Sequence, residues 1–94
     1  MKKLQSSEIQ DLDLRMEIDE VIAVRMGKGG PYELVVLSQE VNEENYLNIL
    51  VTQKNKIRQF KTLDAVDSFL LGIDIYEFTT MSEEAFDEEH VEQG

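Results

Sequence analysis

The feature that most constrains the fold of this chain is a glycine-rich reversal between two apolar runs. Residues 21–26 and 32–37 are the runs, and the sequence GKGGP separates them. Glycine readily adopts the positive φ angles of a tight reversal, and Pro31 has no N–H to give to a ladder, so it belongs at the exit of the turn. The segment therefore predicts a β-hairpin.

A further strand pattern precedes the hairpin, because polar and apolar side chains alternate without a break over residues 11–19. A period of two is typical of a strand with one solvated face. A helix competes with this interpretation, since three apolar residues also fall at helical spacing behind a serine that could cap them. These residues are Ser7, Ile9, Leu12 and Met16. The unbroken alternation favours the strand, and residues 1–8 are expected to be frayed.

Two more strands are predicted after a polar loop at residues 38–45. Residues 46–53 alternate again in hydrophobicity. Residues 54–55 make a suitable two-residue turn, since asparagine tolerates the left-handed conformation. Residues 57–60 then return as a short partner strand.

The hydrophobic period becomes that of a helix after residue 62. Leu63, Val66 and Leu70 form its apolar stripe. Thr62 is a suitable N-cap, and Gly72 ends the helix as a C-terminal glycine. Residues 73–78 alternate once more and predict a closing strand.

Together these elements predict one small α+β domain over residues 1–81, in the order β-β-β-β-β-α-β. Its sheet has four to five mostly antiparallel strands with one helix packed on one face, so the other face is either solvated or a binding surface. Residues 82–94 follow as an acidic tail, which is either a short helix capped by Ser82 or disordered.

The charge of the chain restricts its partners. Twenty acidic side chains stand against nine basic ones, giving a formal net charge of −11 over 94 residues. Such a charge repels bare nucleic acid and anionic membranes and favours basic partners. Cysteine is absent, no apolar run approaches the ~20 residues of a membrane span, and no apolar stretch of a signal peptide follows the first residues. We expect a cytoplasmic protein without a membrane segment.

The sequence does not indicate catalysis. His90 is the single histidine, and it lies in the acidic tail, where a mobile chain cannot hold a general base against a substrate. The glycines at residues 27–30 precede a predicted strand rather than the helix that a phosphate-binding loop requires. The acids around His90 do not match the spacing of a metal-binding loop. We expect a protein that is not an enzyme and that has no cofactor and no specific metal site.

Carboxylates are the strongest candidates for a binding surface. On a strand over residues 11–19, exposed acids would lie about 6.5–7 Å apart, close to the roughly 6–7 Å between neighbouring phosphates of one DNA strand, although Arg15 interrupts the row. A rigid array of this kind could occupy a DNA-binding channel by mimicry. The residues predicted to bind a basic protein surface are Asp11, Asp13, Glu17, Asp19, Glu83, Glu84, Asp87, Glu88 and Glu89.

A basic segment at residues 54–61 supports an alternative function. Cations interleaved with an aromatic side chain are typical of single-stranded nucleic-acid binding, although the acids elsewhere would make such binding weak and sensitive to salt. The candidates are Lys54, Lys56, Arg58, Phe60 and Lys61. The segment could instead attract acidic residues of its own fold or protect an edge strand.

A third alternative is a homodimer. Apolar strand residues such as Val35 or Leu37 would drive self-association if they are exposed.

Residues 58–65 read RQFKTLDA, and the pattern continues through Phe69 and Leu70 to Gly72 and Ile75. This stretch resembles a pattern in small accessory proteins of plasmids, phages and integrative elements, in which a basic strand leads into FKTLDA, an amphipathic helix, a glycine and a closing strand. The resemblance implies an origin in a mobile element rather than an activity. The acidic tail of this chain is not part of that pattern.

Overall fold

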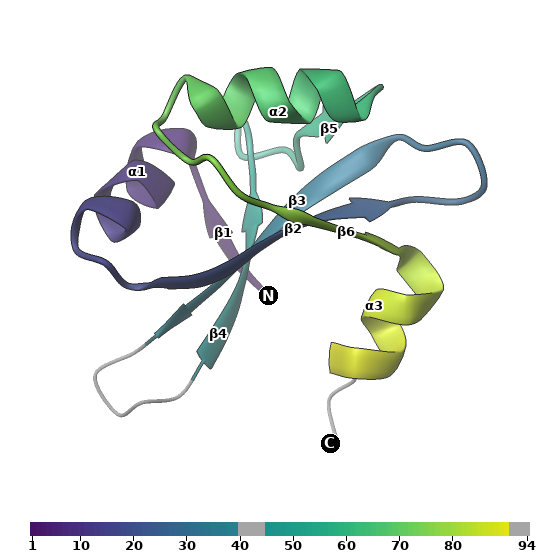
Figure 1. Ribbon diagram of the computed structural model, residues 1–94, viewed down its shortest axis with the longest axis horizontal. Helices are drawn as coiled ribbons and strands as arrows, with labels where there is room; N and C mark the ends of the chain where they lie inside the picture. The colour runs from purple at the N-terminus through teal and green to yellow at the C-terminus, as the bar shows by residue number, and fades with distance from the viewer. Residues whose placement is uncertain (40–44, 91–94) are drawn as a thin grey trace.

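The predicted hairpin forms the centre of the sheet in the computed structural model (Figure 1). Strand β2 (Ile18–Arg25) pairs antiparallel with β3 (Tyr32–Gln39). Gly27 and Gly30 adopt φ angles of 74° and 86°, which lie in the left-handed region that favours glycine. The backbone N–H of Met26 donates to the carbonyl oxygen of Pro31 at 2.8 Å and closes the reversal. The hairpin prediction is confirmed.

The structure describes residues 1–39 and 45–90, which form one small α+β domain with three helices and a mixed sheet of six strands. The remaining strands are β1 (Lys2–Leu4), β4 (Asn45–Leu50), β5 (Gln59–Phe60) and β6 (Thr79–Ser82). The main order is β1-β4-β3-β2-β6, and β5 pairs with the start of β3.

The two outer strands make the sheet mixed. Strand β1 is parallel to β4, and β6 is parallel to β2. The sequence instead predicts a mostly antiparallel sheet of four to five strands. The physical reason for the difference is that neither outer strand follows its neighbour through a tight turn: each pairing spans a long connection that contains a helix, and such connections permit parallel strands.

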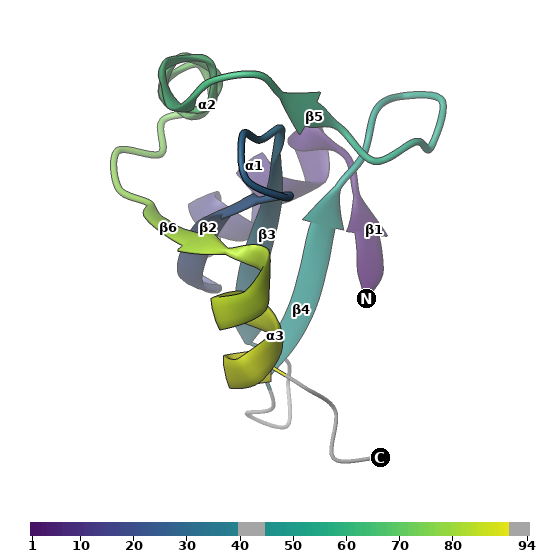
Figure 2. The same cartoon turned by 90° about the vertical axis from the view of Figure 1, so that its right-hand side faces the viewer.

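Helices cover both faces of the sheet (Figures 1 and 2). Helices α1 (Ser6–Leu14) and α2 (Leu63–Leu71) lie on one face, over the core that contains Val21, Ala23, Leu34 and Val36. Helix α3 (Glu83–His90) covers the other face, where Phe86 packs with Ile22, Val24 and Val35. The prediction of a single helix on one face, with a solvated or ligand-binding second face, is therefore wrong.

The predicted strand over residues 11–19 is also wrong, because helix α1 continues to Leu14, a turn follows, and β2 begins only at Ile18. The helical alternative was the right one: Ile9 is buried and Leu12 packs against the core at helical spacing. Leu14 and Met16, which completed the alternation, remain 76% and 90% exposed. The cap is Gln5 rather than Ser7, and the Glu8 carboxylate accepts its backbone N–H at 3.0 Å.

Residues 2–8, at the end expected to be frayed, belong to strand β1 and the first turn of helix α1. Strand β1 pairs with β4, and Leu4 is buried opposite Leu50. Burial of that side chain, together with the cap of α1 that follows directly, holds this end of the chain on the sheet.

The C-terminal half departs from the sequence prediction in two places. Residues 73–78 are not a strand; pairing with β2 begins only at Thr79. The strand expected over residues 57–60 shrinks to β5, with one isolated bridge between Val51 and Ile57. In each case an irregular segment separates the pairing residues from the element before them, and alternation of side chains does not reveal that separation.

The caps expected at Thr62 and Ser82 are present, whereas the turn predicted at residues 54–55 is confirmed only in part. The Thr62 hydroxyl accepts the N–H of Ala65 at 3.1 Å and caps α2. The Ser82 hydroxyl accepts the N–H of Ala85 at 3.1 Å, so the acidic tail begins as the short helix α3. Asn55 has the expected left-handed conformation, with a φ of 66°, but the turn comprises residues 53–55 rather than the predicted pair 54–55, because the N–H of Thr52 donates to the carbonyl oxygen of Lys56 at 2.7 Å. Residues 40–44 of the expected polar loop and residues 91–94 of the expected tail lie outside the described residues.

Helix α1 ends in a Schellman motif whose left-handed residue is a methionine. Met16 has a φ of 59°, its N–H donates to Asp13 at 3.0 Å, and the N–H of Glu17 donates to Leu12 at 2.9 Å. Glycine usually occupies this position, because a Cβ is strained there.

Replacing Met16 with glycine should therefore raise the free energy of unfolding by about 0.5–1 kcal/mol, since the exposed side chain contributes little packing. Urea unfolding followed by circular dichroism measures the change. Leu14→Gly is the matched control, because that residue is equally exposed but right-handed, and it should lower the stability by about 1 kcal/mol. A loss of stability in Met16→Gly would contradict the strain argument.

Candidate functional site, an acidic groove

A groove of about 860 Å³ lies where β2 and the segment before β6 separate. Residues 18–21 of β2 form one side, and residues 74–79 form the other. Asp13, from the last turn of α1, closes the groove at one end. Figure 1 shows the segment from α2 passing α1 before it joins the sheet as β6. Residues far apart in the sequence therefore build one hollow.

The end of α2 directs the chain along the groove. Helix α2 ends at Leu71 with Gly72 as its C-cap, so the predicted stop at this glycine is confirmed. Gly72 is right-handed, however, and the left-handed residue that reverses the chain is Asp74, whose φ is 62°. The N–H of Ile75 donates to the carbonyl oxygen of Leu70 at 2.9 Å. This bond spans five residues, like the bond from Glu17 to Leu12 at the end of α1. At the far end of the groove, the Thr79 hydroxyl donates to Glu20 Oε2 at 3.0 Å and ties β6 to β2.

The groove combines acidic walls with an apolar floor. Its five carboxylates are Asp13, Asp19, Glu20, Asp74 and Glu77, and its apolar side chains are Ile18, Val21, Ile75 and Phe78. No lysine or arginine is among the lining residues. Tyr76 stands at the rim, 71% exposed, and its hydroxyl donates to Asp74 Oδ1 at 3.4 Å. Such a surface favours a ligand that is cationic and partly apolar.

The carboxylates line the groove without converging on one point. Among the described residues, no three His, Cys, Asp or Glu side chains come close enough to hold a metal ion. The lining also lacks the histidine or lysine that a nucleophile–base pair would use. The spread of acidic residues along the groove is suited to an extended cationic group.

Sequence reasoning found two of the groove carboxylates. Asp13 and Asp19 lie in it, whereas Asp11 is exposed on α1 and Glu17 has its carboxylate 3.7 Å from Arg15 Nε. The other three, at positions 20, 74 and 77, were missed. The one available signal was the run DIYE at residues 74–77, in which acids and an exposed tyrosine interrupt an apolar segment.

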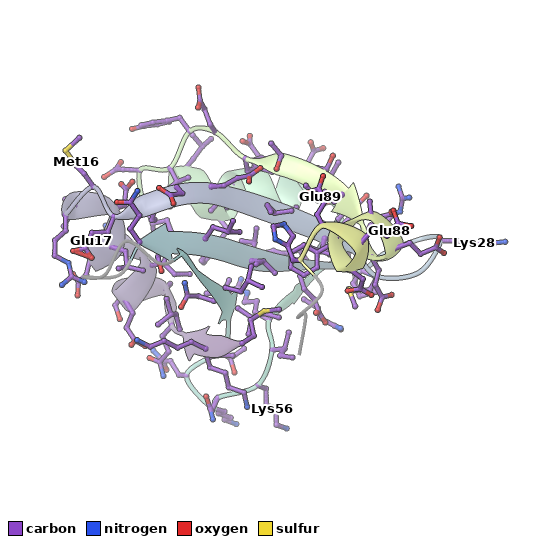
Figure 3. All side chains as sticks on the ribbon, turned by 90° about the horizontal axis from the view of Figure 1, so that it is seen from below. Met16, Glu17, Lys28, Lys56, Glu88 and Glu89 are labelled. Carbon is purple, nitrogen blue, oxygen red and sulfur yellow. The ribbon has the colours of Figure 1, made fainter. Side chains whose placement is uncertain are left out.

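The predicted acids of α3 form a separate surface on the other face of the sheet. Glu83, Glu84, Asp87, Glu88 and Glu89 are all exposed around the helix that Phe86 anchors. Figure 3 shows Glu17 near one end of the molecule and Glu88 and Glu89 toward the other. The evenly spaced row of carboxylates expected over residues 11–19 is absent, because α1 replaces the strand.

The aromatic member of the basic segment is not exposed. Phe60 is only 4% exposed and packs against Phe69 at 5.4 Å between ring centroids. The guanidinium carbon of Arg58 lies 4.9 Å from the Phe60 centroid and 5.0 Å from that of Phe69. Strand β5 begins only at Gln59, so Lys56 and Arg58 lie outside it. Lys54, Lys56 and Lys61 remain exposed.

The apolar residues suggested for dimer formation are not free. Val35 is buried beneath α3, and Leu37 is half-buried beside the same cluster. The expectation that they are exposed is wrong, since α3 covers the face on which they lie.

No protein-family model matches the chain, and no curated protein or solved structure matches it significantly. The resemblance of residues 58–75 to accessory proteins of mobile elements therefore stays a prediction. Within residues 1–39 and 45–90, no helix is both long and apolar enough to cross a bilayer.

Proposed function

We propose that this chain is a small, non-enzymatic binding module that holds a basic part of a protein partner in its acidic groove. One observation carries the proposal: five acidic residues line the groove together with apolar ones, and no lysine or arginine in the lining balances them. Opposite charge steers association, whereas the apolar floor supplies area to bury once the partner is in place.

The rest of the surface supports the same kind of partner. The net charge of −11 attracts basic proteins at long range, and the acids of α3 add to this field. DNA-binding proteins are one class of basic partner that fits. The chain would meet such a partner in the cytoplasm, as an accessory protein of a mobile element. Mimicry of DNA through evenly spaced acids on a strand has lost its geometric basis, so the groove takes its place in the proposal.

Neutralising part of the groove should weaken binding of a basic probe. We expect the variant Asp13→Asn, Asp19→Asn, Glu77→Gln to bind a labelled peptide of alternating lysine and valine roughly tenfold less tightly, since each exposed ion pair contributes about 0.2–1 kcal/mol. Fluorescence anisotropy at low and high salt measures the affinity. Glu20 is left intact because its carboxylate accepts a hydrogen bond from Thr79, and Asp74 because its backbone has a left-handed conformation.

The variant Asp87→Asn, Glu88→Gln, Glu89→Gln is the matched control. It also removes three negative charges, but from α3, which lies away from the groove. This variant should change the affinity less than about threefold. Equal weakening by both variants would show that net charge, not the groove, determines binding. An affinity that does not respond to salt would contradict the electrostatic proposal altogether.

Nucleic-acid binding is the second candidate function, and one observation favours it. Lys54 and Arg58 line a hollow of about 560 Å³ together with Ser6 and Ser7, at the positive end of α1. A gel-shift experiment with single- and double-stranded DNA at low salt tests it. Without a shift, this candidate is removed.

A further inference from the structure

Strand β2 has an open edge inside the acidic groove. On one side β2 pairs with β3 from Ile18 to Arg25, but on the other side β6 pairs only with Ile22–Arg25. Among the described residues, no backbone hydrogen bond joins the segment 74–78 to residues 18–20. These three residues line the groove, so their free edge faces its interior. An unpaired strand edge is a template for pairing with another chain.

From this edge we infer that the groove binds its partner as an extended basic segment, which adds to the sheet beside the first residues of β2. The inference rests on the proposed function and names the form in which the partner binds. Strand addition gives affinity through main-chain hydrogen bonds and specificity through alternate side chains.

The groove matches both halves of that mode of binding. Alternate side chains of an added strand point to opposite sides. Apolar ones would meet the half-buried side chains of Ile18 and Phe78, and basic ones would reach Asp19 on the edge and Glu77 across the groove. The exposed Tyr76 ring at the rim offers a further contact for a cation.

Charge decides which strand the edge accepts. Asp19 and Glu20 lie on the open edge, and a register shift interrupts the pairing between Ile18 and Glu20. Charges and irregularities of this kind protect edges from pairing with copies of themselves. Two acidic edges repel each other, so the same residues that exclude a second copy of this chain favour a lysine- or arginine-rich segment.

The experiment uses the whole chain unchanged and modifies only the backbone of the peptide probe. The probe is a peptide of alternating lysine and valine, and two further versions carry N-methyl groups on the backbone that block either one edge or the other. We expect one N-methylated version to bind about tenfold less tightly and the other to bind like the parent, because only one edge of the peptide faces β2. Amide hydrogen exchange should slow at residues 18–20 when the parent peptide is bound.

The outcomes separate this inference from the proposed function. If both N-methylated versions bind as the parent does, and salt still weakens all three, strand addition is wrong and the electrostatic proposal survives. If no peptide binds at low salt, both fail. If the protein alone has a mass above 10.9 kDa and slow exchange at residues 18–20, a second copy occupies the edge and the inference is overturned.

Discussion

Replacing Phe86 with alanine should lower the free energy of unfolding by roughly 3 kcal/mol, because the substitution removes a buried aromatic side chain and leaves a cavity. Phe86 is the buried residue of α3 and packs with Ile22, Val24 and Val35. A domain of 94 residues has a total stability of roughly 5–14 kcal/mol, so the loss is a large part of it. Urea unfolding followed by circular dichroism measures the change.

The same variant should also associate. With α3 released, the apolar side chains of β2 and β3 on that face become exposed, and light scattering should report a mass above 10.9 kDa. Phe86→Leu is the control, since it keeps an apolar anchor and should lose less than half as much stability. An unchanged urea midpoint for Phe86→Ala would show that α3 does not depend on this contact.

The second large effect is expected from Asn48→Asp. Asn48 is 1% exposed, and its amide donates to the carbonyl oxygen of Val36 at 3.0 Å and to the Ser38 hydroxyl at 2.8 Å. A carboxylate donates to neither and places a charge in the core. We expect a loss of about 3 kcal/mol or more at pH 7.

The loss should depend on pH, with a definite sign. Burial raises the folded-state pKa of the introduced carboxyl above its unfolded value of about 3.9. The penalty is therefore smallest below that unfolded value and grows as the pH rises toward the folded pKa, where it levels off. Unfolding at several pH values measures it. Asn55→Asp, at an exposed turn, is the control and should change the stability by less than about 0.5 kcal/mol. A penalty that does not vary with pH would contradict burial of the charge.

Local chemistry predicted the elements whose signals lie close together in the sequence. The GKGGP reversal places β2 beside β3, and Thr62 caps α2 in the way its position indicates. Helix α1 was misread because Leu14 and Met16 continue the alternation, yet both are exposed. Only burial, which depends on the whole fold, shows that the pair Ile9 and Leu12 determines the element.

The candidate site could not be assembled from the sequence, because it depends on a non-local pairing. Ile22 lies beside Thr79 in the parallel ladder, and this contact brings residues 74–78 opposite the start of β2. Asp13 and Asp19 were selected for a strand that does not exist, although both line the groove. Glu20 carried no local signal that distinguishes it from other surface acids, and the run DIYE was the one signal for Asp74 and Glu77.

The late position of β6 in the chain has a consequence for when binding becomes possible. While the protein is being synthesised, β2 and β3 can form their hairpin long before residues 79–90 emerge. Until β6 and α3 have folded onto the hairpin, the groove lacks one wall. The apolar side chains of β2 and β3 that α3 covers are exposed to water during that time. A nascent chain therefore has the complete groove only after β6 and α3 have docked.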